Sequence, residues 1–269
     1  MKLLLQLSKM EELNVLDNRI NGYILSVKDL SINYGLYFDI EQMKNTINYL
    51  KENKKEVIIN INKNIHNNDI PLLIDCLKAI NELGVDYVIY YDLAVLNIVK
   101  EYNMKINLVY GANTYITNYN IINFYKDSVD GFVLSNEITR QDIKQIRGNT
   151  KSKLFCNVLG YNMLLVTKRR LITNYLTHIN KEKEKDIYYL EEKVNKDKNI
   201  IVETGGVSVI YSKNIINVLD DEVVGYIDYG IINLSLTDYN LDDVFNNKIE
   251  VNTNFLDKKT VYKVGDIRE

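Results

Sequence analysis

The side chains best suited to chemistry stand in short polar segments that directly follow apolar, strand-like runs. One such segment, Ser-Asn-Glu, contributes Ser135 and Glu137 just before a helical pattern begins. Glu137 can act as a general acid or base, or bind a cationic group, and it is our candidate catalytic residue. An equally good interpretation is a carboxylate that stabilises the N-terminus of the next helix. Ser135 is assigned to substrate binding, because no base is evident beside it that would activate a nucleophile.

A second group of candidates can donate and accept hydrogen bonds. The segment GANTYITN at 111–118 supplies Asn113, Thr114 and Asn118 after the expected fifth strand, and we expect them to orient an amide group of a substrate. Turn formation explains polar residues after a glycine equally well. Three further polar residues that follow strands are expected to be helix N-caps: Asp92, Thr117 and Thr139.

Three adjacent cations, Lys168, Arg169 and Arg170, follow the expected seventh strand. A run of charges is often only a solvated face, but many barrels bind phosphate or carboxylate near this position. We therefore expect Lys168 and Arg169 to bind an anionic group. Tyr161, which precedes the run, is a candidate for contact with the substrate and, if the ligand is RNA, for stacking on a base.

Several motifs with defined chemistry are absent from the sequence. It contains no GxSxG, HExxH, GxxxxGK[ST] or GxGxxG pattern, so serine-hydrolase, zinc-protease, P-loop and dinucleotide sites lack their defining residues. The two histidines lie far apart, and the two cysteines, Cys76 and Cys156, do not have metal-ligand spacing. The sequence therefore predicts neither a bound metal nor a cofactor.

Eight short apolar runs alternate with longer segments in which apolar residues recur every three or four positions. This alternation predicts parallel strands joined by helices. About 250 residues is typical of a (β/α)8 barrel, and this chain has 269. We therefore expect one (β/α)8, or TIM-barrel, domain over 1–269, with strands at 2–7, 22–26, 57–61, 87–91, 106–110, 131–135, 154–159 and 224–229.

The spacing breaks between the seventh and eighth expected strands. Residues 161–219 contain the basic run, two β-rich runs around the polar turn NKDKN, and a Gly205-Gly206 pair typical of a hairpin turn. We expect a small β insertion that extends over one mouth of the barrel, and a helix at 213–221 that leads to the last strand. Residues 235–269 are expected to form a C-terminal extension, with one further strand at 258–264.

The overall charge is small. A balance of 33 basic and 36 acidic residues gives −3, so any contact with nucleic acid must be local. The apolar start of the chain is too short for a signal peptide, and the uncharged segment 106–125 contains too many asparagines to cross a bilayer. We expect a cytoplasmic protein that does not contact a membrane.

Five stretches of the sequence resemble the U32 family of peptidases, in particular its short bacterial members. They are VDYVIYYDLAVL (85–96), GANTYITNYNIINFY (111–125), DGFVLSNEITRQDIKQI (130–146), LGYNMLLVTKRRLITNY (159–175) and FLDKKTVYKV (255–264). The resemblance implies a (β/α)8-like fold. It also implies one of three activities: collagenase-like proteolysis, a part in the hydroxylation of tRNA or ribosomal RNA, or a part in oxygen-independent ubiquinone synthesis. Several members carry an iron–sulfur cluster held by four cysteines, which two cysteines cannot supply.

Three functional hypotheses remain open at this point. The first is a peptidase or other hydrolase that binds a small peptide or a polar anionic substrate at the carboxyl ends of the strands. The second is an accessory barrel that binds RNA or a partner protein, with the partner supplying the redox centre. The third is a barrel that keeps the family scaffold after its ancestral site was lost.

Overall fold

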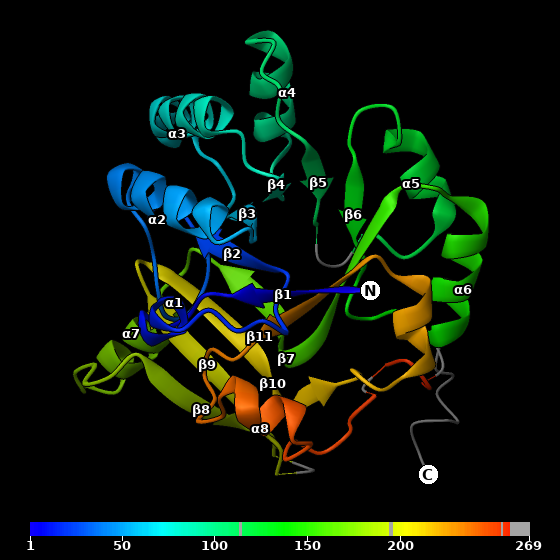
Figure 1. The fold of residues 1–269 in the computed structure, drawn as a ribbon. Helices are drawn as coiled ribbons and strands as arrows, with labels where there is room; N and C mark the ends of the chain where they lie inside the picture. The colour runs from blue at the N-terminus through cyan, green and yellow to red at the C-terminus, as the bar shows by residue number, and fades with distance from the viewer. Residues whose placement is uncertain (113–114, 194–195, 254, 259–269) are drawn as a thin grey trace.

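The computed structural model describes residues 1–112, 115–193, 196–253 and 255–258, and within them eight parallel strands close into a barrel (Figure 1). Each barrel strand pairs with the next one in chain order, and the last pairs with both the first and the seventh, which closes the ring. The predicted (β/α)8 fold is thereby confirmed. The strands are β1 (Lys2–Gln6), β2 (Gly22–Ser26), β3 (Glu56–Ile61), β4 (Tyr87–Tyr90), β5 (Leu108–Tyr110), β6 (Gly131–Val133), β7 (Lys153–Thr167) and β11 (Tyr229–Asn233).

Helices surround the barrel and connect its strands (Figure 1). Asp92 and Thr139 cap their helices as predicted, because each side chain accepts a hydrogen bond from a backbone N–H of the first turn. In the third case the cap is Asn118 and not Thr117: Asn118 accepts from the N–H groups of Asn120 and Ile121. The helices are α1 (Glu11–Asn14), α2 (Ile40–Glu52), α3 (Ile70–Leu83), α4 (Leu93–Glu101), α5 (Tyr119–Tyr125), α6 (Arg140–Asn149) and α8 (Leu241–Phe245), with 3₁₀ turns η1 (Asn67–Asp69) and η2 (Glu222–Tyr226).

The interior of the barrel is filled by alternate residues of its strands, because successive side chains of a strand point to opposite faces. The ring of Phe155 stacks on that of Tyr229 with 4.4 Å between centroids. This packed interior confines any chemistry to the ends of the barrel. The inward side chains form one buried apolar cluster: Leu4, Ile24, Ile58, Ile89, Val109, Val133, Phe155, Tyr229 and Ile231.

The eighth strand differs from its prediction. Residues 222–226 form the 3₁₀ turn η2, and the strand begins at Tyr229 and ends at Asn233. The carboxylate of Asp228 fixes this start, since it accepts a hydrogen bond from the N–H of Leu154 at 2.9 Å, beside the start of β7. The predicted helix at 213–221 is also wrong, because its first five residues extend a strand instead.

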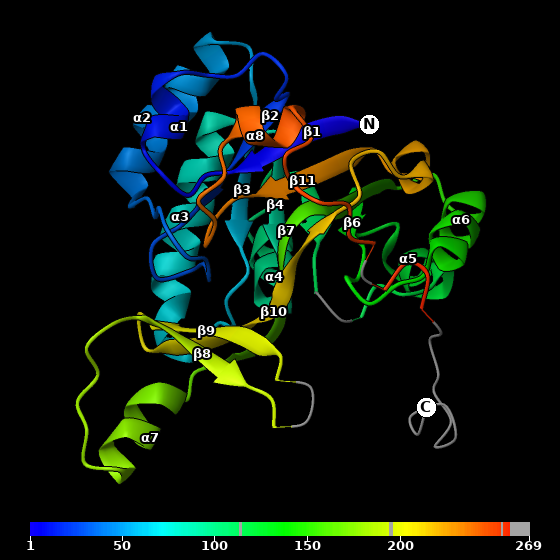
Figure 2. The ribbon, with the colours of Figure 1, turned by 90° about the horizontal axis from the view of Figure 1, so that it is seen from below.

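The insertion between β7 and β11 forms an extension that we call the arm. In the arm β7 continues beyond the barrel and pairs with β10 (Val207–Asn217), followed by β9 (Lys198–Thr204) and β8 (Ile187–Glu191), all antiparallel. Gly205 and Gly206 form the turn between β9 and β10 with φ of +57° and +78°, as the glycine pair predicts. Helix α7 (Leu171–His178) completes the arm, which lies at the end of the barrel to which the parallel strands point (Figure 2).

The described part of the C-terminal region packs back on the barrel and the arm. Asn252 forms an antiparallel bridge with Asn217 of β10, and the carbonyl of Leu256 accepts a hydrogen bond from the N–H of Arg140. Residues 259–264 of the predicted further strand lie outside the described residues. Among the helices of the described chain, none combines the length and apolar character needed to cross a bilayer.

Candidate functional site at the barrel mouth

Amide side chains line the end of the barrel at which the strands finish. In a strand, residues two apart face the same side, so a residue two places beyond an inward apolar side chain also points into the barrel. The register sets Gln6 beside Asn233, next to each other around this mouth. Four strands have an amide at that position: Gln6 after Leu4, Asn60 after Ile58, Asn157 after Phe155 and Asn233 after Ile231.

The cavity at this mouth has a volume of about 80 Å³ and an uncharged polar lining. Burial raises the pKa of the Tyr211 and Tyr161 phenols, so both stay protonated at neutral pH. Groups of these kinds bind and orient a neutral polar molecule through hydrogen bonds. Every polar side chain of the lining is an amide or a phenol: Gln6, Asn33, Asn60, Asn62, Tyr91, Asn136, Asn157, Tyr161, Tyr211 and Asn233.

The amides differ in how far the protein itself satisfies them. Asn62 accepts from the N–H of Ile32 at 2.6 Å and donates to the carbonyl of Ile32 at 3.0 Å, while Asn157 Nδ2 donates to Asn136 Oδ1 at 2.8 Å. Asn60 is 9% exposed, and its Oδ1 has no hydrogen-bond partner within the described ranges. A buried acceptor without a partner is costly, so Asn60 gains most from a ligand that brings a donor.

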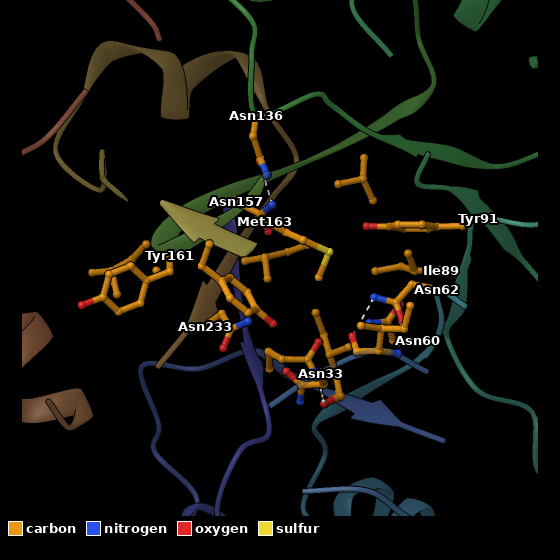
Figure 3. Close-up of a pocket in the computed structure, with 18 residues that line it drawn as sticks. Asn33, Asn60, Asn62, Ile89, Tyr91, Asn136, Asn157, Tyr161, Met163 and Asn233 are labelled. Atoms are coloured by element: carbon orange, nitrogen blue, oxygen red, sulfur yellow. Dashed lines mark hydrogen bonds between the residues drawn. The ribbon is translucent and has the colours of Figure 1, made fainter. Parts of the chain in front are cut away.

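Tyr91 and Tyr161 lie on opposite sides of the cavity, and the hydroxyl of Tyr161 points away from Tyr91 (Figure 3). The position of Tyr91 depends on Gly111 of the next loop. A Cβ at Gly111 would lie 3.1 Å from Tyr91 Cε1 and 2.9 Å from Ile89 Cγ2. Glycine at 111 therefore leaves the space that the ring of Tyr91 occupies.

Beyond Tyr91 the mouth opens onto a shelf, a cleft of about 350 Å³. Tyr91 and Met163 line both spaces, so the shelf continues the mouth cavity. Tyr115 on the shelf is 67% exposed. The other residues that line the shelf are Ile32, Asn62, Asn64, Tyr110, Ala112, Leu164, Leu165 and Val166.

The arm reaches the mouth because the backbone of β7 passes very close to β11. Gly160 has φ of +134°, and a Cβ there would lie 2.4 Å from the carbonyl oxygen of Asn233, which only glycine avoids. Directly after this contact, Tyr161 and Met163 enter the cavity lining. At the tip of the arm, Lys168 Nζ lies 3.6 Å from a carboxylate oxygen of Asp69, which ties the arm to the loop after β3.

Three of the predicted site residues on the loops after β5 and β6, Asn118, Ser135 and Glu137, do not line this cavity. Ser135 is buried and accepts a hydrogen bond from the N–H of Glu137 at 3.1 Å, so it shapes the turn after β6. Glu137 is exposed on that turn and does not line the mouth cavity. Asn118 is the exposed cap of α5, whereas Asn113 and Thr114 lie outside the described residues.

The predicted residues of the arm are closer to the mouth. Tyr161 is part of the lining, as predicted for a residue that contacts substrate. Lys168 and Arg169 are exposed at the turn from β7 into α7, and both are accessible to an anion outside the cavity. The roles assigned to these residues, and to Glu137 and Ser135, stay predictions.

The two cysteines do not suit an iron–sulfur cluster. Cys76 is buried in α3 and Cys156 in β7, and burial raises the pKa of each thiol to about 12. Two protonated thiols on separate elements do not provide four thiolate ligands. Across the described residues, no group of three or more His, Cys, Asp or Glu side chains comes together as a set of metal ligands.

Of the polar residues that line the mouth, the sequence prediction names only Tyr161, and it assigns no role to the amides, Gln6 and Asn233 among them. In the sequence these residues can be recognised as amides two positions beyond an inward-facing apolar residue of a strand. This pattern can be applied only where the ends of the strand are predicted correctly. For Asn233 the last strand was expected five residues too early. The residue therefore fell outside the strand ends that were searched.

Comparison with known proteins gives a consistent family and fold. The family model described as Peptidase family U32 matches residues 9–187. A tRNA hydroxylation protein P2 of Bacillus subtilis (strain 168) is 26% identical over 201 residues, which cover 72% of this chain and 65% of that protein. An uncharacterized protease, MJ0090, of Methanocaldococcus jannaschii is 30% identical over 144 residues, which cover 52% of this chain and 35% of that protein.

The chain spans less than two thirds of the length of either curated relative. Among solved structures, that of the U32 peptidase Mk0906 superposes with a TM-score of 0.54 at 12% identity, over 87% of this chain and 92% of that one. At this identity the likeness concerns the fold, and it agrees with the barrel described above.

Proposed function

The chain belongs to peptidase family U32, and we propose that it binds tRNA and holds one unpaired nucleobase on the adjoining shelf, with an edge of the base directed at the amides of the barrel mouth. The observation that carries the proposal is the lining of the mouth, whose polar side chains are all amides and phenols. The edges of a nucleobase present neutral donors and acceptors that amides match, and its faces stack on aromatic rings. The lining therefore favours capture of a base over proton transfer.

The surroundings of the mouth suit the rest of a nucleic acid strand. The shelf beside Tyr91, with exposed Tyr115, offers a surface on which the captured base can stack. Lys168 and Arg169 at the tip of the arm can contact phosphates, which carry most of the affinity for nucleic acid. Among RNAs we choose tRNA because of the similarity to the tRNA hydroxylation protein P2.

Peptide binding is the second candidate, favoured by the similarity to the uncharacterized protease MJ0090. Backbone amides of an extended peptide also match amide side chains. A peptidase would act on a bond held at the mouth, and Ser135 and Glu137 stand on the turn after β6, apart from the mouth lining. Peptide binding is therefore the alternative outcome of the experiment below.

The proposal is tested by fluorescence anisotropy with a labelled tRNA anticodon stem–loop and, in parallel, a labelled blocked peptide. We expect the stem–loop to bind more tightly than the same stem closed by perfect pairing, because only the loop offers an unpaired base. Raising the salt concentration should weaken binding, and replacing both Lys168 and Arg169 with alanine should reduce the log–log salt slope by about two.

The matched control removes two exposed lysines at the other end of the barrel, Lys126 after α5 and Lys151 before β7. This Lys126→Ala/Lys151→Ala variant should keep the salt slope of the unmodified chain. Equal affinity for the loop and the fully paired stem would contradict base capture. Tight binding or cleavage of the peptide, with no binding of RNA, would replace the proposal with the peptidase reading.

A further inference from the structure

A second cleft, of about 230 Å³, lies between the loop after β2 and the arm. Three parts of the chain form it: residues 28–37, Lys63 after β3, and residues 202–211 of β9, β10 and the turn between them. It is adjacent to the mouth, because Ile32, Asn33 and Tyr211 line both spaces. The cleft therefore adjoins the mouth at these three side chains.

The walls of this cleft are apolar. Val202, Val209 and Tyr211 are no more than 5% exposed, and with Ile32 and Val207 they belong to the cluster that packs the arm against the loop after β2. Protein interiors leave few voids larger than a water molecule. A cleft of this size at a packed apolar contact is therefore suited to an apolar group of a ligand.

The polar groups of the cleft fall into two kinds. The hydroxyls of Ser31 and Tyr37 are already used, since each donates to a backbone carbonyl and accepts from a backbone N–H. Lys28 and Lys63 bring ammonium groups, and Lys63 Nζ is held by the carbonyl of Asp29 at 2.6 Å. With the Asp29 carboxylate counted, the side chains of the lining carry two positive charges and one negative, a balance of +1.

We propose that this cleft binds a small organic anion, with a compact apolar body against Val202, Val207 and Val209 and a carboxylate at Lys28 and Lys63. An engineered cavity of about 150 Å³ holds benzene, so about 230 Å³ accommodates one ring and a short carboxylate-bearing chain. The two ammonium groups supply charge-assisted hydrogen bonds to the carboxylate. The apolar walls exclude a hydrophilic anion such as phosphate from the greater part of the cleft.

This inference goes beyond the proposed tRNA binding, because it assigns a second ligand to a separate space. It rests on the lining of the cleft alone. Ile32, Asn33 and Tyr211 line both spaces, whereas Lys28, Lys63 and Val209 line the cleft and not the mouth. The two sites can therefore be tested separately.

The test uses 3-phenylpropionate as the probe and its neutral amide, 3-phenylpropanamide, as the matched ligand, both titrated by saturation-transfer NMR on the full chain. We expect the acid to bind and the amide to bind about tenfold more weakly, because only the acid pairs with the ammonium groups. Added salt should weaken binding of the acid and leave that of the amide unchanged. Equal affinity for acid and amide would overturn the proposal.

Variants then locate the bound probe. Lys28→Gln and Lys63→Gln should each weaken binding of 3-phenylpropionate several-fold. Val209→Phe should abolish its binding by filling the cleft. Lys151→Gln at the other end of the barrel is the control and should bind normally. If Val209→Phe fails to fold, the lysine variants still decide, since unchanged binding in both of them contradicts the assignment. Anisotropy with the stem–loop should be unaffected by Lys28→Gln, which separates this site from the mouth.

Discussion

At the scale of single residues, two amides of the mouth, Asn60 and Asn62, differ in whether the protein satisfies their hydrogen bonds. Asn60 and Asn62 are both nearly buried and both line the cavity. Both polar atoms of the Asn62 side chain hydrogen-bond to the backbone of Ile32, whereas Asn60 Oδ1 is buried without a partner in the part of the chain described here. The first amide thus supports the loop after β2, and the second is available to a ligand.

This contrast predicts opposite effects of the same substitution. Asn60→Leu should raise the free energy of unfolding by about 1 kcal/mol, because it removes an unpaired buried acceptor, and should weaken stem–loop binding about three- to tenfold. Asn62→Leu, the matched control, should lower the free energy of unfolding by about 2 kcal/mol, since it leaves two backbone groups of Ile32 unpaired. Urea denaturation of both variants measures this, and an equal loss of stability in the two would contradict the assigned roles.

At the scale of elements, the arm is held together by one buried carboxylate. Glu203 of β9 is 3% exposed and accepts hydrogen bonds from the N–H groups of Ile172 and Thr173, at the start of α7, and from the Ser208 hydroxyl. Burial opposes its ionisation, but the hydrogen bonds from Thr173, Ser208 and the two backbone amides outweigh it and lower its pKa. By anchoring the start of α7, Glu203 fixes the short segment 168–170 that joins β7 to α7 and carries the three cations.

Because the pKa of Glu203 is lowered on folding, its stabilisation is complete well above its ordinary pKa of 4.5 and is lost as the pH falls through the folded value. Glu203→Gln should therefore loosen α7 already at neutral pH, by about 2 kcal/mol or roughly thirtyfold in amide exchange. Hydrogen exchange at 171–178 measures it. Glu191→Gln on β8, whose carboxylate pairs only with exposed Lys196 and Lys198 within the described chain, is the control and should leave exchange of α7 unchanged.

The same elements show how much of the fold can be predicted from the sequence. The first seven strands are apolar runs buried on both faces, which a period-based prediction finds without tertiary information. Residues 222–234 contain two apolar runs, and only the contact of Asp228 with Leu154 decides that the second is the strand. Residues 213–217 are a strand because Ile215 and Ile216 pair with Tyr161 and Gly160, far away in the sequence. The positions of the amide side chains at the barrel mouth depend on these registers.

At the scale of the whole molecule, a salt-bridge network at the end of the barrel opposite the arm links the strands at which the ring closes. Asp228, just before β11, accepts from Arg147 of α6 at 2.7 Å, from the N–H of Leu154 and from Lys153 at 3.3 Å. Burial opposes the ionisation of Asp228, but the Leu154 hydrogen bond and the two cations outweigh it and lower its pKa. The network joins β7 and β11, where the ring is completed.

Asp228→Asn should lower the global free energy of unfolding by about 1–2 kcal/mol at neutral pH. The difference from the unmodified chain should shrink as the pH falls below the ordinary pKa of 3.8, because protonation removes the same contribution from the unmodified protein. Thermal denaturation from pH 7 to pH 3 measures both effects. Exposed Asp220→Asn serves as the control, and a difference that is independent of pH would contradict the assignment to the carboxylate.

The pairing of β1 with β11 also has a consequence during synthesis. Lys2 aligns with Tyr229, so β1 leaves the ribosome more than 200 residues before the strand that covers its second edge. Until then the nascent chain presents an apolar strand with unpaired backbone groups, the type of surface that chaperones shield and that joins wrongly to other chains. Pairing of β11 with both β1 and β7 converts an aggregation-prone intermediate into a closed barrel.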